Sequence, residues 1–285
     1  MTLDPSLLDS LVETALAAGR VVMDVYGGDF AVATKGDASP VTAADERAEA
    51  VILADLARLM PGVAVVAEEE AAAGRLPVSL GERFVLVDPL DGTKEFVSRN
   101  GEFTVNIAVV EGGGPIAGIV FAPALGEIHV GSIGAGARAG RIDADGRVVW
   151  RDITVRPPPV EGLVVLASRS HAGPETEDLL ARLPVARRVS AGSSLKFCRV
   201  AAGEADLYPR LGRTMEWDTA AGDAVLRAAG GAVVDLDGRP LLYGKRKQTS
   251  DVDFANPWFL AGGSAATLSA AVVAATGAAG ASGPG

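Results

Sequence analysis

The chain has 285 residues, of which 48% are hydrophobic and 22% are charged, a composition typical of a globular protein with one large domain or two smaller ones. Its 36 acidic and 26 basic residues give a net charge of −10, which argues against nucleic acid polymers and anionic membranes as partners, since both attract clustered positive charge. The single cysteine, Cys198, excludes an internal disulfide and fits a reducing, cytoplasmic location.

Helical patterns come first along the chain, and strands follow. Hydrophobic residues at helical spacing predict a half-buried helix over 5–26, and a second helix over 42–59 is expected to begin with Thr42 as its N-cap. Apolar runs bounded by Gly, Pro and Asp-Gly turns then predict strands within 63–68, 83–88, 103–112, 115–131 and 147–155. The glycines of 131–140 have the wrong spacing for a dinucleotide loop, so we assign this stretch to turns and 141–150 to a hairpin.

Three consecutive prolines at 157–159 indicate a domain boundary, because such a run fits neither inside a helix nor inside a paired strand. We therefore predict one domain over 1–158 and a second over 159–285. In the second, strands and helices alternate, as in a layered α/β domain. The predicted helices cover 174–183, 194–202 and 218–229, and the predicted strands lie within 163–170, 187–192, 205–210 and 231–236.

The carboxy-terminal stretch, residues 257–285, contains no charged side chain. It consists mostly of Ala, Gly, Ser and Thr, which are too weakly hydrophobic to predict a membrane span. We expect a buried strand over 258–263, a helix over 264–275 and then a flexible tail.

Acidic residues lie where predicted strands end and where predicted helices begin. Glu68 and Asp88 each end an apolar strand, so they can lie at the same end of one sheet, and Asp91 follows Asp88 by three residues. Asp45 and Asp218 lie in the first turns of predicted helices. The acids therefore fall at positions from which several could converge.

Each acid alone also has an ordinary explanation. Asp91 or Thr93 can cap a short helix over 93–99, and Asp88 can then face water. Glu69 and Glu70 are expected on a solvated face, as most runs of glutamate are. Only the complete set indicates a functional site.

The set has the composition of a magnesium site, because hard divalent cations take oxygen ligands. Neither His129 nor His171 has a histidine or cysteine partner at the spacing of a zinc site. Two or three Mg²⁺ ions would bind a phosphate and generate a nucleophilic hydroxide, as in two-metal phosphatases. The backbone N–H groups of Gly92 and Thr93, at a helix start, could hold that phosphate.

Two motifs carry a resemblance to a known family. "VDPLDGT" at 87–93 and "WDTAAGDAV" at 217–225, with the pair Glu68-Glu69 twenty residues before Asp88, resemble the lithium-sensitive, magnesium-dependent inositol monophosphatase superfamily over nearly the whole chain. Within it, "KGDASPVTAAD", "TKEF", "SRSH" and "GSSLKFC" with "GEADLYPR" are similar to the bacterial 3′(2′),5′-bisphosphate nucleotidases, which remove the 3′-phosphate of adenosine 3′,5′-bisphosphate. Inositol phosphatases usually have a shorter neutral side chain where this sequence has Lys94.

The resemblance implies a role for each matching residue. Thr93, paired with Asp45 and near Glu68, would orient and deprotonate the attacking water, because threonine alone is a poor base. His171 would face the nucleotide, although a loop histidine in contact with water is the alternative. The implied metal ligands are Glu68, Asp88, Asp91, Asp218 and the Leu90 carbonyl, and the implied substrate contacts are Gly92, Thr93, His171, Ser193, Lys196 and Arg210.

The expected fold is therefore α/β, a layered α+β sandwich of the inositol monophosphatase type, with an antiparallel sheet in its first part and a smaller mixed sheet in its second. The expected function is Mg²⁺-dependent hydrolysis of the 3′-phosphate of adenosine 3′,5′-bisphosphate, with its sulfated precursor as a further expected substrate. An inositol or sugar monophosphatase is one alternative, and a catalytically silent nucleotide sensor is another. The preference among these substrates and the oligomeric state stay open.

Overall fold

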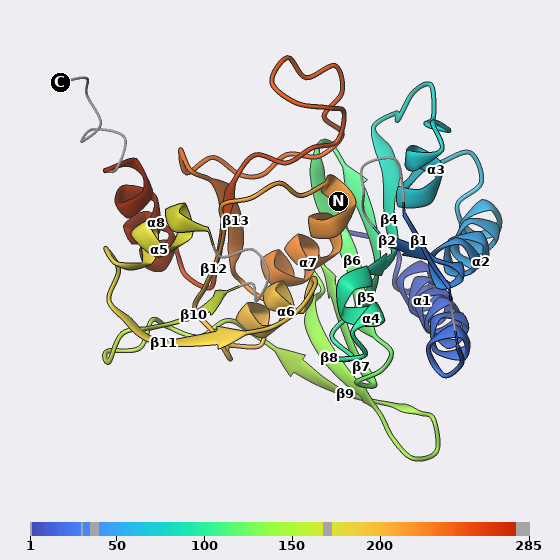
Figure 1. Cartoon of the computed structure of the whole chain (residues 1–285), viewed down its shortest axis with the longest axis horizontal. Coiled ribbons are helices and arrows are strands. Elements are labelled where there is room, and N and C mark those ends of the chain that lie inside the picture. Colours follow the sequence, from blue (N-terminus) through green and yellow to red (C-terminus); the bar gives the residue numbers. More distant parts are fainter. Residues whose placement is uncertain (1, 30, 35–39, 168–172, 278–285) are drawn as a thin grey trace.

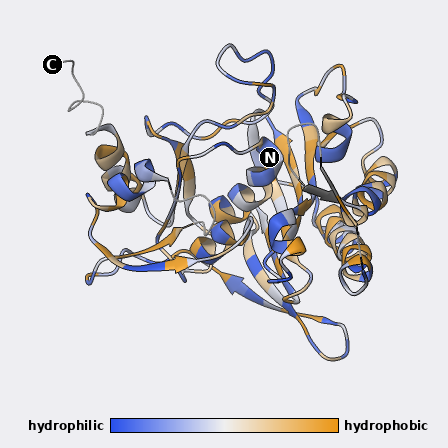
Figure 2. Cartoon of the chain, in the orientation of Figure 1, coloured by the Kyte–Doolittle hydropathy of each residue, from blue (hydrophilic) through white to orange (hydrophobic). Residues whose placement is uncertain are grey.

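The first layer of the molecule consists of α1 (Pro5–Tyr26) and α2 (Ala43–Leu59), which pack against one face of a large sheet (Figure 1). The computed structural model describes residues 2–29, 31–34, 40–167 and 173–277. Thr42 caps α2 as predicted, since its hydroxyl accepts from the Ala44 N–H at 3.1 Å. Figure 2 shows α1 with hydrophobic and hydrophilic residues side by side, as expected of a half-buried helix. A short antiparallel pair, β1 (Val32–Thr34) and β2 (Pro40–Thr42), precedes α2.

The large sheet has seven strands in the order β3-β4-β5-β6-β7-β8-β9. Only β3 and β4 run parallel, and every other neighbouring pair is antiparallel. Two short helices, α3 (Glu68–Ala72) and α4 (Thr93–Val97), follow β3 and β4. The strands are β3 (Ala64–Ala67), β4 (Arg83–Asp91), β5 (Thr104–Glu111), β6 (Gly114–Ala122), β7 (Glu127–Ser132), β8 (Gly136–Ile142) and β9 (Val148–Ile153).

The apolar run of β4 is explained by its burial on both faces. Val85 and Val87 belong to the core under α1 and α2, whereas Phe84 and Leu86 belong to the core on the opposite face. This second face is covered by α7 (Glu216–Ala228). A strand between two helical layers has no polar side, so its residues are continuously hydrophobic.

The small residues of α7 allow it to lie very close to the large sheet. A Cβ atom on Gly118 of β6 would contact the Ala221 carbonyl oxygen, and it would lie 2.8 Å from the Ala221 Cα and the Ala224 Cβ. Glycine is therefore required at this position by the closeness of the helix. The approach matters for the site, because α7 also carries Asp218.

The second sheet has five strands in the order β11-β10-β12-β14-β13, with both parallel and antiparallel pairs. α6 (Leu195–Ala201) and α7 lie between the two sheets, and α5 (Pro174–Leu180) with α8 (Ala265–Thr276) forms the last layer (Figure 1). The layers thus follow the order helices, sheet, helices, sheet, helices. The strands are β10 (Leu163–Ala167), β11 (Val185–Ser190), β12 (Leu207–Arg210), β13 (Ala232–Asp235) and β14 (Phe259–Gly262).

Most predicted elements are confirmed, and three predictions are corrected. β4 does not end at Asp88 but continues to Asp91, with an irregular register that accommodates Pro89. Only 133–135 within 131–140 form a turn, because 131–132 end β7 and residues from Gly136 onward form β8, paired on both sides. α7 begins two residues before Asp218. The 115–131 run contains two strands, and the hairpin turn over 143–147 is confirmed.

The carboxy-terminal strand and helix are confirmed as β14 and α8, and the predicted tail over 278–285 lies outside the described residues. Among the helices that are described, none is both long and apolar enough to cross a membrane. The predicted boundary at 158/159 falls in the loop between β9 and β10. One core cluster, which includes Phe84 and Val225, draws on residues from both sides of that loop.

Candidate active site

The parallel pairing of β3 and β4 brings two predicted site residues to one edge of the large sheet. Ala67 is opposite Val87 in the register, so Glu68 and Asp88, the next residues, follow at the same end. Glu68 begins α3 and lines a pocket there. Asp88 is 1% exposed, and its carboxylate accepts from the Leu90 N–H at 3.0 Å.

The pocket lies between the two halves of the chain and has a volume of about 230 Å³. Asp45, Asp88 and Leu90 are buried and do not line it, and His171 lies outside the described residues. Eight predicted site residues do line it, namely Glu68, Asp91, Gly92, Thr93, Ser193, Lys196, Arg210 and Asp218. Residues that are up to 150 positions apart in the sequence therefore share one cavity.

Asp91 connects the two halves through hydrogen bonds. Its carboxylate accepts from the Ser193 hydroxyl at 2.6 Å, from the Ser194 N–H at 2.7 Å and from the Ser194 hydroxyl at 3.1 Å. The prediction that Asp91 or Thr93 caps the following helix is therefore wrong, since the N-cap of α4 is Gly92 and no side chain caps it. Gly92 has φ of +92°, a left-handed conformation that glycine adopts readily.

The carboxyl group of Asp218 is strongly perturbed by its surroundings. It lies in the first turn of α7, where it accepts from the Met215 N–H at 2.8 Å. Burial, followed by the negative charges of Asp91 and Glu68, raises the pKa of Asp218 well above its usual value. Three carboxylates from separate elements therefore repel one another, and a cation among them would relieve this repulsion.

The chemistry of the pocket fits Mg²⁺, because its acids offer oxygen ligands. No histidine or cysteine is among the described residues that line the pocket. As the side chains stand, no three Asp, Glu, His or Cys residues in the described ranges are grouped closely enough to hold a metal ion. The carboxylates of Asp88, Asp91 and Asp218 are instead turned toward hydrogen-bond donors of the protein.

The same pocket is also lined by two basic residues, Lys196 and Arg210. Lys196 is 5% exposed, and its ammonium donates to the Ser193 carbonyl at 2.7 Å and to the Ala191 carbonyl at 3.2 Å. Burial lowers the pKa of Lys196 to about 8, partly offset by the charge of Asp91. Arg210, on β12, donates to the Arg213 carbonyl at 3.1 Å, while its Nε is buried and makes no hydrogen bond within the described part of the chain. These cations can hold an anionic group of a ligand.

Comparison with known proteins shows which family and which relatives the chain resembles. The family model described as the inositol monophosphatase family matches residues 4–272. The chain is 44% identical to the 3′(2′),5′-bisphosphate nucleotidase CysQ of Escherichia coli K12 over 255 residues, covering 89% of this chain and 98% of that protein. The crystal structure of CysQ from Bacteroides thetaiotaomicron is similar with a TM-score of 0.72 and 34% identity, covering 90% of this chain and 97% of that one.

The chain belongs to the inositol monophosphatase family. An inositol monophosphatase from Anabaena sp. PCC 7120 has the same fold, with a TM-score of 0.72 and 27% identity over 93% of this chain and 94% of that one. The α/β class and the family resemblance are thus both confirmed.

Within the inositol monophosphatase family fold, Asp45 and Thr93 lie on neighbouring segments. Asp45 is 1% exposed, and its carboxylate accepts from the backbone N–H and the hydroxyl of Thr42 at 2.8 and 2.9 Å. The Thr93 hydroxyl donates to the Leu90 carbonyl at 3.4 Å. α4, which starts at Thr93, packs against β2, which ends at Thr42. The pairing of Thr93 with Asp45 stays a prediction.

Glu49 is a functional candidate that sequence reasoning missed. It is 3% exposed on α2, and its carboxylate accepts from the Glu69 N–H at 2.8 Å and the Glu70 N–H at 3.0 Å. This contact fixes the start of α3, where Glu68 lies. Burial raises the pKa of Glu49 to about 7, although the two N–H groups act in the opposite direction. The only signal was its position four residues after Asp45, on the same helix face.

The neighbours of Glu68 are less solvated than predicted. Glu69 and Glu70 are both half-buried, and Glu70 forms an ion pair with Arg75 at 2.7 Å.

Ser194 and Tyr208 also contribute to the site, the first through its hydrogen bonds to Asp91 and the second as part of the pocket wall. The ammonium of Lys196 lies 5.3 Å from the centre of the Tyr208 ring.

Proposed function

We propose that this chain is a Mg²⁺-dependent 3′(2′),5′-bisphosphate nucleotidase, which hydrolyses the 3′-phosphate of adenosine 3′,5′-bisphosphate to give AMP and phosphate. The sulfated precursor of this nucleotide carries the same 3′-phosphate and is a second proposed substrate. The observation that carries the proposal is a single pocket lined both by the carboxylates of Glu68, Asp91 and Asp218 and by the cations Lys196 and Arg210. A substrate with two phosphates can use both sets of groups, since only one phosphate is cleaved. The identity to CysQ over nearly the full length of both chains supports the same assignment.

In this proposal, metal binding is assigned to the predicted acids. Two or three ions would be held by Glu68, Asp88, Asp91, Asp218 and the Leu90 carbonyl. Bound Mg²⁺ lowers the pKa of water and neutralises phosphate oxygens, which is the chemistry that the site requires. The crowding of Glu68, Asp91 and Asp218, which raises the pKa of Asp218, supports a cation at this place.

The remaining residues would position water and substrate. The Thr93 hydroxyl would orient the attacking water and transfer a proton toward Asp45, because threonine needs a carboxylate to act as a base. The N–H groups of Gly92 and Thr93 would hold the phosphate that is cleaved. Ser193, Lys196 and Arg210, together with His171, would contact the adenosine and its second phosphate. The unused Nε of Arg210 supports this last role.

The division into domains 1–158 and 159–285 also belongs to this proposal. The first domain would supply Glu68, Asp88 and Asp91, and the second would supply Asp218 and most nucleotide contacts. We further propose a cytoplasmic location, which the single, buried and unpaired Cys198 supports.

An inositol monophosphatase is the second candidate function, since solved inositol monophosphatases share the fold. The experiment that separates the two compares phosphate release from adenosine 3′,5′-bisphosphate and from inositol 1-phosphate, each with Mg²⁺ and with EDTA. We expect kcat/KM to favour the nucleotide by at least ~100-fold, because inositol 1-phosphate has no second phosphate for Lys196 and Arg210 to contact. A preference for inositol 1-phosphate would overturn the substrate assignment, and nucleotide binding without turnover would indicate a silent sensor.

A further inference from the structure

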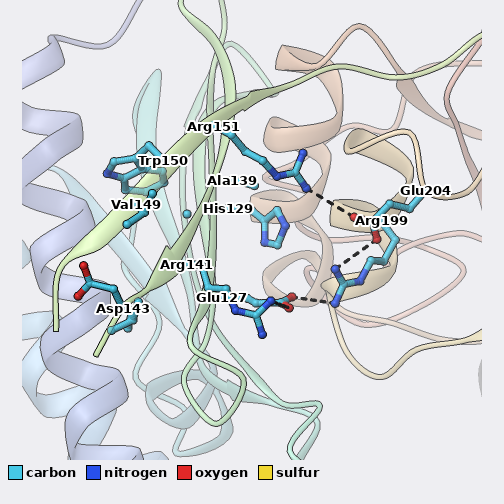
Figure 3. Close-up of a pocket in the computed structure, with 12 residues that line it drawn as sticks. Glu127, His129, Ala139, Arg141, Asp143, Val149, Trp150, Arg151, Arg199 and Glu204 are labelled. Atoms are coloured by element: carbon cyan, nitrogen blue, oxygen red, sulfur yellow. Dashed lines mark hydrogen bonds and ion pairs between the residues drawn. The ribbon is translucent and has the colours of Figure 1, made fainter. Parts of the chain in front are cut away.

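A second cavity lies on the large sheet, away from the candidate active site. It has a volume of about 460 Å³, within the range of small-molecule sites, and shares no lining residue with the first pocket. Its floor is the face of β7, β8 and β9 (Figure 3). α6 borders both cavities, since Lys196 lines the first and Arg199, three residues later, lines the second.

The floor is built from two rows of residues across three strands. His129, Ala139 and Arg151 are opposite one another in the register, and Glu127, Arg141 and Val149 form the next row. Residues two apart on a strand point to the same face, so both rows project toward α6. β9 is the edge strand of the sheet, which leaves the cavity open on that side.

His129 is the residue at this site that the proposed reaction does not explain. Its side chain is 3% exposed and projects toward α6, and its buried Nδ1 has no hydrogen-bond partner in the described chain (Figure 3). Burial, with the nearby charges of Arg199 and Arg151, lowers the pKa of His129 to about 3. A neutral imidazole can carry its proton on Nδ1 and donate it, whereas a buried polar atom without a partner is unfavourable.

Two arginines beside His129 also have unused donors. Arg141 lies 3.8 Å from Glu127 and Arg151 lies 3.6 Å from Glu204, distances too long for hydrogen bonds. The two glutamates are instead bound by Arg199, which donates to Glu127 at 2.7 Å and to Glu204 at 3.3 Å. Asp143 also lines the cavity, so its three arginines are balanced by three carboxylates, and the attraction for an anion comes from the unused donors of Arg141, Arg151 and His129.

We propose that this cavity binds a small organic anion, whose phosphate, phosphonate or carboxylate group contacts Arg141, Arg151 and the Nδ1–H of His129. Its apolar part would lie against Ala139 and Val149, the latter 61% exposed. Guanidinium groups suit such oxyanions because they donate parallel hydrogen bonds.

The chain allows a direct test, because it contains only two histidines, His129 and His171. In the full-length protein with Mg²⁺ and ¹⁵N-labelled histidine, the His171→Gln variant identifies which nitrogen signals belong to His129. Phenylphosphonate, which has an anionic group, an apolar ring and no ester bond to hydrolyse, is the probe. We expect phenylphosphonate to shift the His129 Nδ1 signal until the site is saturated. The dissociation constant from this titration should be lower than that for inorganic phosphate or for benzyl alcohol.

Variants then connect the signal to the proposed contacts. Arg141→Gln with Arg151→Gln should weaken the binding about tenfold or more, because two charged contacts are lost. This double variant should retain turnover of adenosine 3′,5′-bisphosphate, since neither residue lines the candidate active site. Arg147→Gln, which removes an exposed arginine from the neighbouring hairpin, is the matched control and should leave binding unchanged.

Two results would overturn the proposal. One is the lack of any saturable change at His129 up to about 10 mM probe, well above the range in which even a weak small-molecule site fills. The other is a change that is equally strong in the double variant. The first would mean that the cavity binds no such anion, and the second would mean that the arginines do not form the site.

Discussion

Asp88 is almost completely buried, and its carboxylate accepts a hydrogen bond from the N–H of Leu90, two residues later in β4. Asparagine can accept the same hydrogen bond, but it lacks the negative charge that a divalent cation needs. We therefore predict that Asp88→Asn lowers kcat by at least ~100-fold, more than the loss of a residue that only supports a ligand. The free energy of unfolding should change little. Asp24→Asn, an exposed change on α1, is the control. Near-normal turnover in the Asp88 variant would remove Asp88 from the metal site.

Lys196 makes the proposed site dependent on pH. Its pKa is lowered to about 8, so it is charged below this pH and loses its charge as the pH rises through it. If Lys196 holds the second phosphate, kcat/KM for adenosine 3′,5′-bisphosphate should fall above about pH 8, and the fall should be smaller for inositol 1-phosphate. The two pH profiles measured in parallel test this assignment, and profiles of identical shape would argue against it.

At the scale of single residues, the sequence predicted the acids better than their surroundings. Asp88 and Asp91 could be identified because they lie near the end of an apolar strand. The serines that bind Asp91 are about a hundred positions away, and only a family resemblance, not a local pattern, pointed to Ser193. Glu49 was missed for the same reason, since its partners lie 20 and 21 residues later in another element.

Among the elements, the contact of α7 with β6 has the clearest consequence. Gly118→Ala would place a methyl group against the α7 backbone, which cannot move aside as the end of a side chain can. We predict a loss of about 1–3 kcal/mol in the free energy of unfolding, measured by denaturant titration. Activity should also fall, because α7 carries Asp218. Gly28→Ala has ordinary contacts and serves as the control. Equal stability of both variants would contradict the close packing.

The elements that escaped prediction are those without a clear period. α3 has five residues, too few to show helical spacing, and β8 contains Gly136 and Gly140, which suggested turns. The end of β4 was predicted too early, at Asp88, because proline usually interrupts a strand. The strand continues past Pro89 because its register is irregular there. Long helices such as α1 were predictable, since their hydrophobic residues repeat over many turns.

The whole molecule has a continuous interior despite its two sheets. The cluster that contains Phe84 and Val225 includes residues before and after the proposed boundary at 158/159. We therefore predict one cooperative unfolding transition, with coincident curves from tryptophan fluorescence and circular dichroism. Two separated transitions would mean that the proposed domains are stable independently.

The alternation of layers could be predicted from the sequence. That α6 and α7 pack between both sheets could not, because this depends on contacts between segments that are distant in the sequence.

If the pocket binds the nucleotide as proposed, hydrolysis is directed to the 3′-phosphate. This is tested by incubating the full chain with adenosine 3′,5′-bisphosphate and Mg²⁺ and identifying the nucleotide product by ³¹P NMR. We expect adenosine 5′-monophosphate with an equal amount of phosphate, and no reaction when EDTA removes the metal. Release of adenosine 3′-monophosphate, or the same rate without metal, would contradict the proposal.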